Sequence, residues 1–468
     1  MGIVVDRDPP SRRCRGRVKL SGQSSTGQPA ALISYVVEPA RAGKPADSAL
    51  TVSGVFSALR SRNFRLLWLS QSASVIGDAL VIVAIGLYVT RLTGNPADVG
   101  VVLAAYSLPL VLFVLLGGVV ADRLPRQVVM LVADTVQGLL HGTLAVLIAI
   151  GVVRVWHMVV IGVLFGTAEA FFQPAYTGLV PQTVDEPDIQ AAQALGGVSR
   201  EVASFASPAL ATALVLGVGG AAAFGLDALT FAFSAALLAR VHPRARGAVA
   251  MRRTVIAELR EGWVAVRERS WLWATIAAFS ASLLLALAPF FVLGASVARE
   301  VYGSDAVFGL TNAAWGVGTA AGAVVGSWWR PHRPVLAGML AGLSWPGAIT
   351  LYAVGPPLPV LYAAMAAAGV GIGLFGVWWE TAIAQRIPAH LLSRVSAWDW
   401  LGSIAPLSVG YLLVGSVAGE LGAVPVLFVG GLLGVAACSL ALLPRSTRTL
   451  TRVEAAGAST ATVVESPA

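Results

Sequence analysis

Long apolar runs separated by short polar segments dominate the chain from residue 66 to residue 443. A helix needs about 20 predominantly apolar residues to cross roughly 30 Å of hydrocarbon, and twelve runs of the chain meet that requirement. The expected spans are 66–90, 99–120, 127–151, 155–181, 190–216, 219–240, 271–298, 307–329, 334–354, 358–385, 392–418 and 423–443. The pattern therefore predicts an all-α membrane protein with twelve transmembrane helices.

The predicted spans form two sets of six with similar spacing. Gly118 lies 52 residues after Leu66 in the first set, and Gly326 lies 55 residues after Trp271 in the second. Such spacing indicates an internal repeat. We expect a disordered cytoplasmic tail at 1–61, an N-terminal six-helix bundle at 62–240, a linker at 241–270, a C-terminal six-helix bundle at 271–443 and a cytoplasmic tail at 444–468.

The linker is rich in arginine and contains apolar positions at helical spacing, namely Val255, Leu259, Trp263 and Val266. These positions form one apolar helical face. The pattern predicts an amphipathic helix on the membrane surface, and binding of a regulator is the alternative.

Composition excludes a soluble globular domain, because 56% of residues are hydrophobic, 12% are charged and the mean hydropathy is +0.77. The two cysteines, Cys14 and Cys438, are too few and too far apart for a disulfide framework. The first 50 residues contain eight Lys and Arg but no long apolar core, which argues against a signal peptide. The alternative is a start site nearer Val52, where strong patterning begins.

The net charge of +8 would indicate a nucleic-acid partner in a soluble protein, but its distribution follows membrane topology instead. With the N-terminus inside, 28 Lys and Arg fall in cytoplasmic segments. Only Arg91, Arg154 and Arg299 fall outside, and Arg200 lies within a span. This bias predicts a multi-pass protein of the plasma membrane with both termini in the cytoplasm and no nucleic-acid partner.

The loop between the second and third predicted spans reads Gly-x-x-x-Asp-Arg-x-Pro-Arg from Gly118 to Arg126. This order resembles the signature loop of the major facilitator superfamily, which usually has Gly in place of Pro125 and a second basic residue in place of Gln127. A plain polar hairpin is the alternative. An acid at the inner end of a span pairs with a cation or a helix N-terminus in only one access state, so we expect a conformational latch. Its residues are Gly118, Asp122, Arg123 and Arg126.

Five further segments are similar to the branch of that superfamily that contains macrolide-efflux proteins and enterobactin exporters. They are Gly77-Asp78, Thr93-Gly-Asn-Pro96, Phe172-Gln-Pro-Ala175, Asp227-Ala-Leu-Thr-Phe231 and Arg394-Val-Ser-Ala397. Ser207-Pro-Ala209 departs from the glycine-rich pattern common in exporters and bears against antiport. The resemblance implies a substrate site between the two halves near the midplane, with spans 1, 4, 7 and 10 lining the cavity.

Ionisable residues inside the predicted spans concentrate in the first half. A charge at the bilayer centre costs about 2.5–3.5 kcal/mol, so each needs a partner, a cavity or a function. The first half holds Asp78, Asp134, His141, Glu169, Arg200, Glu201 and Asp227, whereas the second offers Glu380 and Asp399 nearer a membrane surface. We therefore expect ion coupling in the N-terminal half.

Helical spacing places several polar groups on shared faces, with Gln71 and Ser74 beside Asp78, and Gln173 and Tyr176 beside Glu169. Since spans 1 and 4 line the cavity in the superfamily that the chain resembles, we expect Asp78 and Glu169 to carry protons, with Arg200 as counter-charge. A structural role is favoured for Asp134 and Asp227. Permanent pairing of Arg200 with Glu201 or Asp227 is the alternative. The residues expected to line the cavity are Gln71, Ser74, Gln173, Tyr176, Trp378 and Glu380.

Tryptophans near the inner ends of the C-terminal spans are typical of an interfacial aromatic belt, and stacking on a drug-like substrate is the weaker alternative. They are Trp328, Trp329, Trp378, Trp379, Trp398 and Trp400.

No phosphate-binding loop is present, because the only lysines, Lys19 and Lys44, lack the required glycine spacing. No His-Glu-x-x-His or Gly-x-Ser-x-Gly motif occurs, so we expect neither an enzyme nor a cofactor or metal. We expect a monomeric secondary transporter that uses the proton gradient to export a hydrophobic or amphiphilic small molecule by alternating access, with the lipid bilayer as its surroundings. The alternatives are a siderophore or secondary-metabolite exporter, an uptake permease, and a membrane sensor or scaffold that does not transport.

Overall fold

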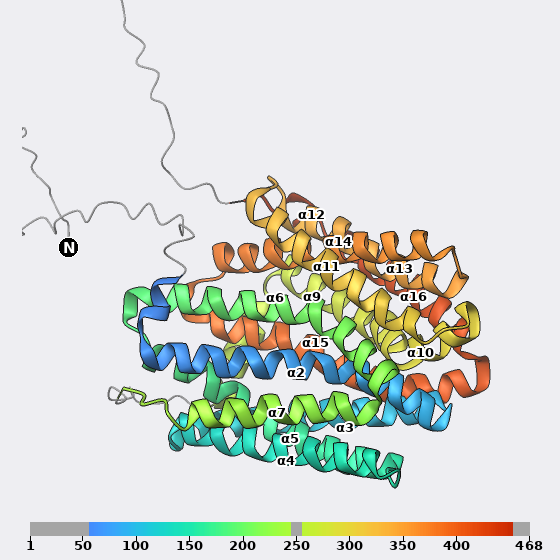
Figure 1. Cartoon of the computed structure of the whole chain (residues 1–468). Coiled ribbons are helices and arrows are strands. Elements are labelled where there is room, and N and C mark those ends of the chain that lie inside the picture. Colours follow the sequence, from blue (N-terminus) through green and yellow to red (C-terminus); the bar gives the residue numbers. More distant parts are fainter. Residues whose placement is uncertain (1–55, 245–254, 453–468) are drawn as a thin grey trace, which may run out of the picture. The chain divides into compact units, whose positions relative to one another are not determined.

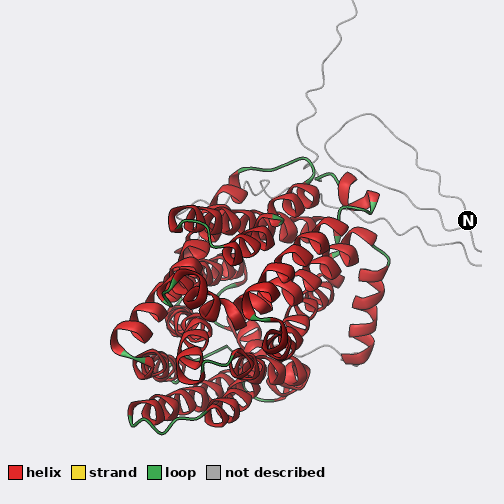
Figure 2. Ribbon diagram, turned by 90° about the vertical axis from the view of Figure 1, so that its right-hand side faces the viewer, coloured by secondary structure: helices red, strands yellow, loops and turns green. Residues whose placement is uncertain are grey.

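The computed structural model describes residues 56–244 and 255–452, within the compact unit 54–468. Its described elements are helices, and the ribbon in Figure 2 has no strand in this part of the chain. Of the two cysteines, Cys438 is a buried free thiol, and Cys14 lies outside the described residues.

Six long helices form the N-terminal half, and they run side by side in Figure 1. They are α2 (Arg62–Thr93), α3 (Pro96–Arg123), α4 (Arg126–Ala149), α5 (Val155–Leu179), α6 (Ile189–Ala213) and α7 (Gly220–Leu238). The short elements η1 (Phe56–Arg60), η2 (Val180–Gln182), η3 (Glu186–Asp188) and the π-helical η4 (Leu214–Val218) flank them.

The C-terminal half follows the linker helix α8 (Val255–Arg267). It contains α9 (Ser270–Ser282), the π-helical η5 (Leu283–Leu287), α10 (Ala288–Tyr302), α11 (Ala306–Trp328), α12 (Pro334–Gly342), α13 (Ser344–Val354), α14 (Leu358–Arg386), α15 (Ala389–Leu421), α16 (Ala423–Leu440) and α17 (Arg445–Thr449). The helices α9 and α10 continue one another through η5, as one apolar stretch of 33 residues.

Local sequence explains the sharp turn between α2 and α3. Gly94 ends α2 with φ 67°, a left-handed conformation that glycine adopts without steric cost. The Asn95 side chain accepts a hydrogen bond from the backbone N–H of Ala97 at 3.0 Å, and Pro96 occupies the first helical position. The Thr-Gly-Asn-Pro segment is therefore a helix stop followed by a helix start.

Ten helical stretches of the described chain are long and apolar enough to cross a membrane, so the predicted count of twelve is not confirmed. The helices α6 and α11 are not among the ten. Both contain polar or small residues, such as Gln193 in α6 and Asn312 in α11. Both also pack against other helices, since α6 contacts α2 and α11, and α11 contacts α14.

The predicted N-terminal tail is too long at its C-terminal end. Phe56–Arg60 form η1, which packs against α2 and α6, and Ala58 is buried. The Ser57 hydroxyl donates to Asp188 at 2.5 Å. Burial and a tertiary hydrogen bond hold these residues in the fold. The C-terminal tail likewise begins with a helix, α17, whose Thr447 is buried.

The linker helix α8 packs on α15 rather than only on a surface. Arg394 pairs with Glu261 at 2.9 Å, and the rings of Trp263 and Trp398 lie 5.0 Å apart. Val266 is buried, whereas Trp263 is 46% exposed. The predicted position of this helix on the membrane surface stays a prediction. The side chains of Val255 and Leu259 are outside the described part of the structure.

Close approaches between the two halves involve four glycines. A Cβ added to Gly100 would lie 2.2 Å from the Tyr411 carbonyl oxygen, and one added to Gly309 would lie 1.5 Å from Thr212 Oγ1. Gly86 and Gly415 have their nearest contacts in the other half in the same way. All four glycines lie toward the end of the helix bundle at which Asp305 is found. We call this the Asp305 end, and the opposite end, where α3 meets α4, the Asp122 end.

Candidate functional site: a buried acid cluster in the N-terminal half

Four carboxyl groups come from four packed helices of the N-terminal half. Asp78 lies on α2, Asp134 on α4, Glu169 on α5 and Asp227 on α7; α7 packs against both α2 and α4, and α4 packs against α5. Asp134 and Asp227 are fully buried. Asp134, Glu169 and Asp227 all act electrostatically on Asp78. We call these four residues the acid cluster. Grouped acids inside membrane helices are costly and mark candidate ion sites.

Glu169 is held by two amides. The Gln137 Nε2 donates to its Oε2 at 3.0 Å from α4, and the Gln173 Nε2 donates to its Oε1 at 2.6 Å from one turn along α5. Gln173 and Glu169 thus share a face, as their spacing predicts. Both oxygens of the Glu169 carboxyl therefore have neutral donors.

Two oxygens of the cluster are buried without a hydrogen-bond partner among the described residues. The Ser234 hydroxyl of α7 donates to Asp134 Oδ2 at 2.5 Å, but Asp134 Oδ1 has no partner. Asp78 Oδ1 has none either. A buried carboxyl oxygen that lacks a donor costs free energy, and protonation reduces that cost.

Asp227 connects α7 to both α2 and α4. Its Oδ2 pairs with His141 Nδ1, and the Tyr106 hydroxyl lies 3.0 Å from the other ring nitrogen, Nε2. A Cβ added to Gly77 would lie only 1.9 Å from Asp227 Oδ1. The Gly77-Asp78 and Asp227–Phe231 motifs therefore meet in space, because only glycine leaves room for the carboxylate.

Arg200 is exposed on α6 and forms no ion pair with the acid cluster within the described chain. Its described neighbours are Tyr176, on which its charge acts, and Gly196. The alternative pairing of Arg200 with Asp227 does not occur, because Asp227 pairs with His141. The side chain of Glu201 lies outside the described residues.

The predicted latch residues lie at the Asp122 end. Arg126 pairs with Asp122 at 3.3 Å one turn away, and its guanidinium also donates to the Gly178 carbonyl at the end of α5. Arg123 is exposed. Gly117 lies close to another backbone, because a Cβ added to it would lie 2.0 Å from the Ala170 carbonyl oxygen, whereas Gly118 faces open space.

Of the residues expected to line a cavity, Gln71 and Ser74 are buried in α2, and Tyr176 is partly buried. Trp378 lies instead in a pocket near the Asp122 end with Arg330 and Arg452, and it donates to the Trp329 carbonyl at 2.9 Å. Glu380 is exposed. The tryptophans expected in an aromatic belt differ in their exposure. Trp328 and Trp329 are 78% and 58% exposed, whereas Trp378 and Trp379 are buried.

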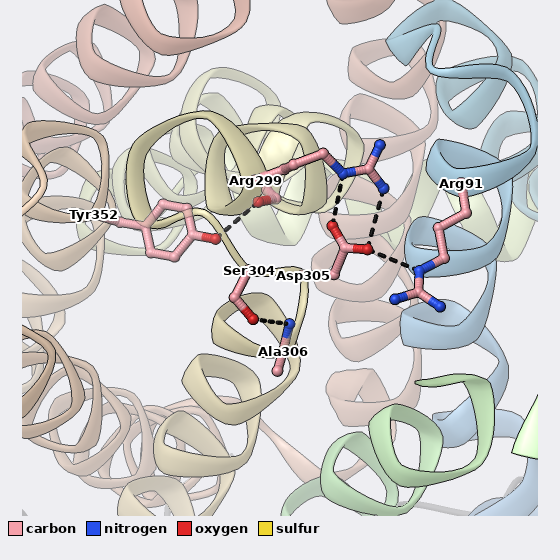
Figure 3. A network of polar contacts seen from close by, with 7 residues as sticks. Arg91, Arg299, Ser304, Asp305, Ala306 and Tyr352 are labelled. Carbon is pink, nitrogen blue, oxygen red and sulfur yellow. Dashed lines mark hydrogen bonds and ion pairs between the residues drawn. The ribbon is translucent and has the colours of Figure 1, made fainter. Parts of the chain in front are cut away.

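A second charged network joins the halves at the Asp305 end (Figure 3). Asp305 accepts from Arg299 of its own half at 2.9 Å and from Arg91 of α2 at 2.7 Å. Burial alone raises the pKa of Asp305, but the hydrogen bonds and charges of the two arginines outweigh it and hold that pKa below the ordinary value of 3.8. Asp305 is therefore ionised at neutral pH.

Sequence reasoning missed Tyr106 and the pairing of Arg91 with Asp305. Tyr106 lies in a strongly apolar run of α3, with no polar neighbour at helical spacing to mark it. Arg91 and Asp305 are 214 residues apart. The available signal was that each is a charged residue next to the end of a predicted span, and both of these ends were predicted to lie on the outer side of the membrane.

Comparison with known proteins gives the family. A profile described as "Transmembrane secretion effector" matches residues 53–464. The uncharacterized MFS-type transporter YfiS of Bacillus subtilis (strain 168) is 25% identical over 170 residues, which are 36% of this chain and 40% of that protein. Macrolide efflux protein A of Streptococcus pyogenes is 24% identical over 215 residues, which are 46% of this chain and 53% of that one. The chain thus spans about half or less of these relatives.

Solved structures show the same fold at low identity. A mutant of the nucleoside transporter NupG superposes with a TM-score of 0.66 at 12% identity, covering 81% of this chain and 99% of that one. A D-xylose-proton symporter superposes with a TM-score of 0.62 at 11% identity, covering 82% and 98%. These structural matches and the helical architecture confirm the predicted all-α membrane fold, apart from the count of twelve spans. The profile covers most of the chain, and we conclude that the protein belongs to the transmembrane secretion effector family of the major facilitator superfamily.

Proposed function

We propose that this membrane transporter exports a hydrophobic or amphiphilic small molecule in exchange for protons, by alternating access of its two halves. The observation that carries the proposal is the acid cluster. Asp78 and Glu169 lie inside the N-terminal half, and Asp78 Oδ1 is buried without a partner among the described residues. A buried carboxyl group that gains and loses a proton as its surroundings change couples a proton gradient to a conformational cycle.

The comparisons support efflux without naming a substrate for this chain. One relative is a macrolide efflux protein, and a macrolide is a large amphiphilic molecule. The match covers about half of that relative, so the substrate class is part of the proposal. The protein would act as a monomer in the plasma membrane with both termini in the cytoplasm, and it would need no cofactor beyond the proton gradient. It is not proposed to be an enzyme.

The energy available from protons is sufficient for export. One charge crossing 100 mV yields about 2.3 kcal/mol, which supports a substrate gradient of about 50-fold before any pH difference is added. A single proton-carrying carboxyl group is therefore enough for substantial accumulation.

Alternating access requires that the two ends open in turn. The four glycine contacts between the halves and the Arg91–Asp305 pair lie toward the Asp305 end. With the charge bias placing the Asp122 end in the cytoplasm, the described state fits one that is closed on the outer side. The Asp122–Arg126 pair would then be remade or broken as the inner side closes.

The test uses the purified full-length protein in liposomes with an imposed pH gradient and membrane potential. The macrolide erythromycin, radiolabelled, is the probe, and its movement and the internal pH are measured together. We expect coupled movement of drug and protons in opposite directions. Asp78→Asn and Glu169→Gln should reduce the accumulation ratio from about 50-fold at 100 mV toward one.

The matched control is Glu420→Gln, which removes an exposed carboxyl group far from the cluster in sequence and should leave accumulation unchanged. If both cluster variants retain gradient-driven export, neither acid is the carrier. If the wild type moves the drug with no proton flux, antiport is wrong.

A further inference from the structure

His141 is the only basic side chain of the described residues that contacts a carboxylate of the acid cluster. It pairs with Asp227, whereas Glu169 contacts only amides and Asp134 contacts only a hydroxyl. Arg200 is exposed and has no such contact. The counter-charge expected from Arg200 is thus available, in this structure, from histidine.

Both ring nitrogens of His141 have partners suited to either protonation state. In the neutral ring, Nδ1–H donates to Asp227 Oδ2, and Nε2 accepts from the Tyr106 hydroxyl at 3.0 Å. In the charged ring both nitrogens donate, and the Tyr106 hydroxyl turns its hydrogen away and accepts. The site can therefore bind a proton at Nε2 without moving a heavy atom.

The ring is enclosed by aromatic side chains. It is fully buried and stacks on Phe165 with centroids 4.4 Å apart and planes 12° apart, while Phe224 and Phe231 approach at steeper angles. A lone charge in such a site is costly, but a cation next to a carboxylate and over a ring face is stabilised. With a proton on Nε2 the His141–Asp227 pair is neutral overall, and without it the pair carries one negative charge.

Titratable groups face this pair from every helix packed around it. Tyr106 on α3 and Asp78 on α2 interact electrostatically with Asp227 on α7. The neighbouring helices α4 and α5 carry the other two acids of the cluster, Asp134 and Glu169. Asp227 Oδ1 lies against Gly77, next to Asp78, and the two acids interact electrostatically. A change of charge on the His141–Asp227 pair therefore changes the electrostatic interaction of that pair with Asp78.

We propose that His141, paired with Asp227, is a proton-binding residue of the transport cycle, with Nε2 as the atom that gains and loses the proton. An N–H bond forms at Nε2 when a proton arrives from water on the open side, and the same bond breaks when the proton leaves to the other side. The inference rests on the proposed proton antiport and deepens it, because it adds a base to the acids that carry the coupling.

Solid-state ¹⁵N NMR of the full-length wild type in liposomes tests the site without any substrate. The His141 signals are identified by their loss in His141→Gln, and independently by transfer from labelled tyrosine, since Tyr106 Oη is 3.0 Å from Nε2. We expect Nε2 to be an acceptor in liposomes prepared at high pH and to be protonated in liposomes prepared at low pH. An Nε2 that stays in one state in both preparations overturns the proposal.

Transport separates this inference from the antiport proposal. We expect His141→Gln to lower proton-driven erythromycin export about ten-fold and to remove one step from its pH profile, while drug exchange without net proton movement is retained. His157→Gln, which alters a histidine at the start of α5 bonded to the Arg154 backbone, should match the wild type. If wild-type export is proton-driven and His141→Gln has the same rate and pH profile, only the role of His141 is wrong. If the wild type shows no proton-driven export, the proposed function itself is wrong.

Discussion

Arg91 and Asp305 form an ion pair between the two halves of the molecule, with 2.7 Å from Nε to Oδ2 (Figure 3). The Asp305 side chain is 9% exposed, and Arg299 of its own half holds it in place at 2.9 Å. The pair therefore consists of an acid fixed on one half and an arginine supplied by the other. Rocking of the halves about a central site must separate these two side chains whenever the Asp305 end opens.

Removal of this pair should favour opening at the Asp305 end. Arg91 is 44% exposed in its side chain, so the pair contributes no more than about 1 kcal/mol and its loss should shift the open population by up to about five-fold. We expect Arg91→Gln and Asp305→Asn to lengthen the distance between spin labels at Thr93 and Ser304, measured by double electron–electron resonance.

The control for that measurement is Arg299→Gln, which removes a contact within one half and should change the distance less than Arg91→Gln does. The double exchange Arg91→Asp with Asp305→Arg should restore the shorter distance. Equal distances in the wild type and Arg91→Gln would show that the pair does not hold this end closed.

The Arg91–Asp305 pair should be insensitive to pH in the physiological range. The pKa of Asp305 is depressed below 3.8 in the folded protein, so the stability it contributes is present above that ordinary value and is lost only as pH falls through the lower folded value. We expect the difference in the Thr93–Ser304 label distance between the wild type and Asp305→Asn to stay constant from about pH 8 to about pH 5. A difference that shrinks over this range would mean that Asp305 loses its charge there, and it would contradict the prediction.

The Asp122–Arg126 contact should matter for transport and little for stability. The two side chains are 42% and 22% exposed, so the free energy of unfolding should change by less than about 1 kcal/mol in Asp122→Asn. Arg126 keeps its bond to the Gly178 carbonyl in that variant. We expect slower erythromycin export at normal membrane abundance, and Glu420→Gln, which changes an exposed residue outside the loop, serves as the control. Full export by Asp122→Asn would leave the loop as a simple polar hairpin.

Two adjacent glycines should respond oppositely to alanine. Gly117→Ala places a methyl group 2.0 Å from the Ala170 carbonyl oxygen and should destabilise the protein by about 1–3 kcal/mol. Gly118→Ala meets open space and should be neutral or slightly stabilising, because alanine is the better helix former by about 1 kcal/mol. Thermal unfolding in detergent measures both. Equal midpoints for the two variants would contradict the packing of α3 on α5.

Most of the fold follows from local properties of the sequence. Run length and hydropathy predicted the helices, and the Gly118–Arg126 pattern predicted the superfamily, because apolar length and loop motifs are read without knowing which helices touch. The same reading missed the packed η1 and the reduced apolarity of α6 and α11. Those differences arise where contacts with neighbouring helices, rather than lipid, decide burial.

The acid cluster was predicted as a set of acids on particular helical faces, but its partners were not. Helical spacing correctly put Gln173 beside Glu169, since both lie on α5. Arg200 was expected as the counter-charge of Asp78 and Glu169, but it is exposed. The described basic side chain that contacts the cluster is His141, which pairs with Asp227, 86 residues away on another helix. Spacing along one helix fixes which side chains share a face, but the rotation of one helix against the next determines which faces meet.

The sequence by itself determined that the chain is a helical membrane protein with acids inside the first set of helices. It also predicted an internal repeat and basic segments at one side of the membrane. Only the tertiary structure decided that Tyr106 and Asp227 contact His141, that Gly117 rather than Gly118 packs closely, and that Arg91 meets Asp305. The physical reason is that hydropathy acts on each segment separately, whereas hydrogen bonds and ion pairs depend on atoms being within about 3 Å after the helices have packed.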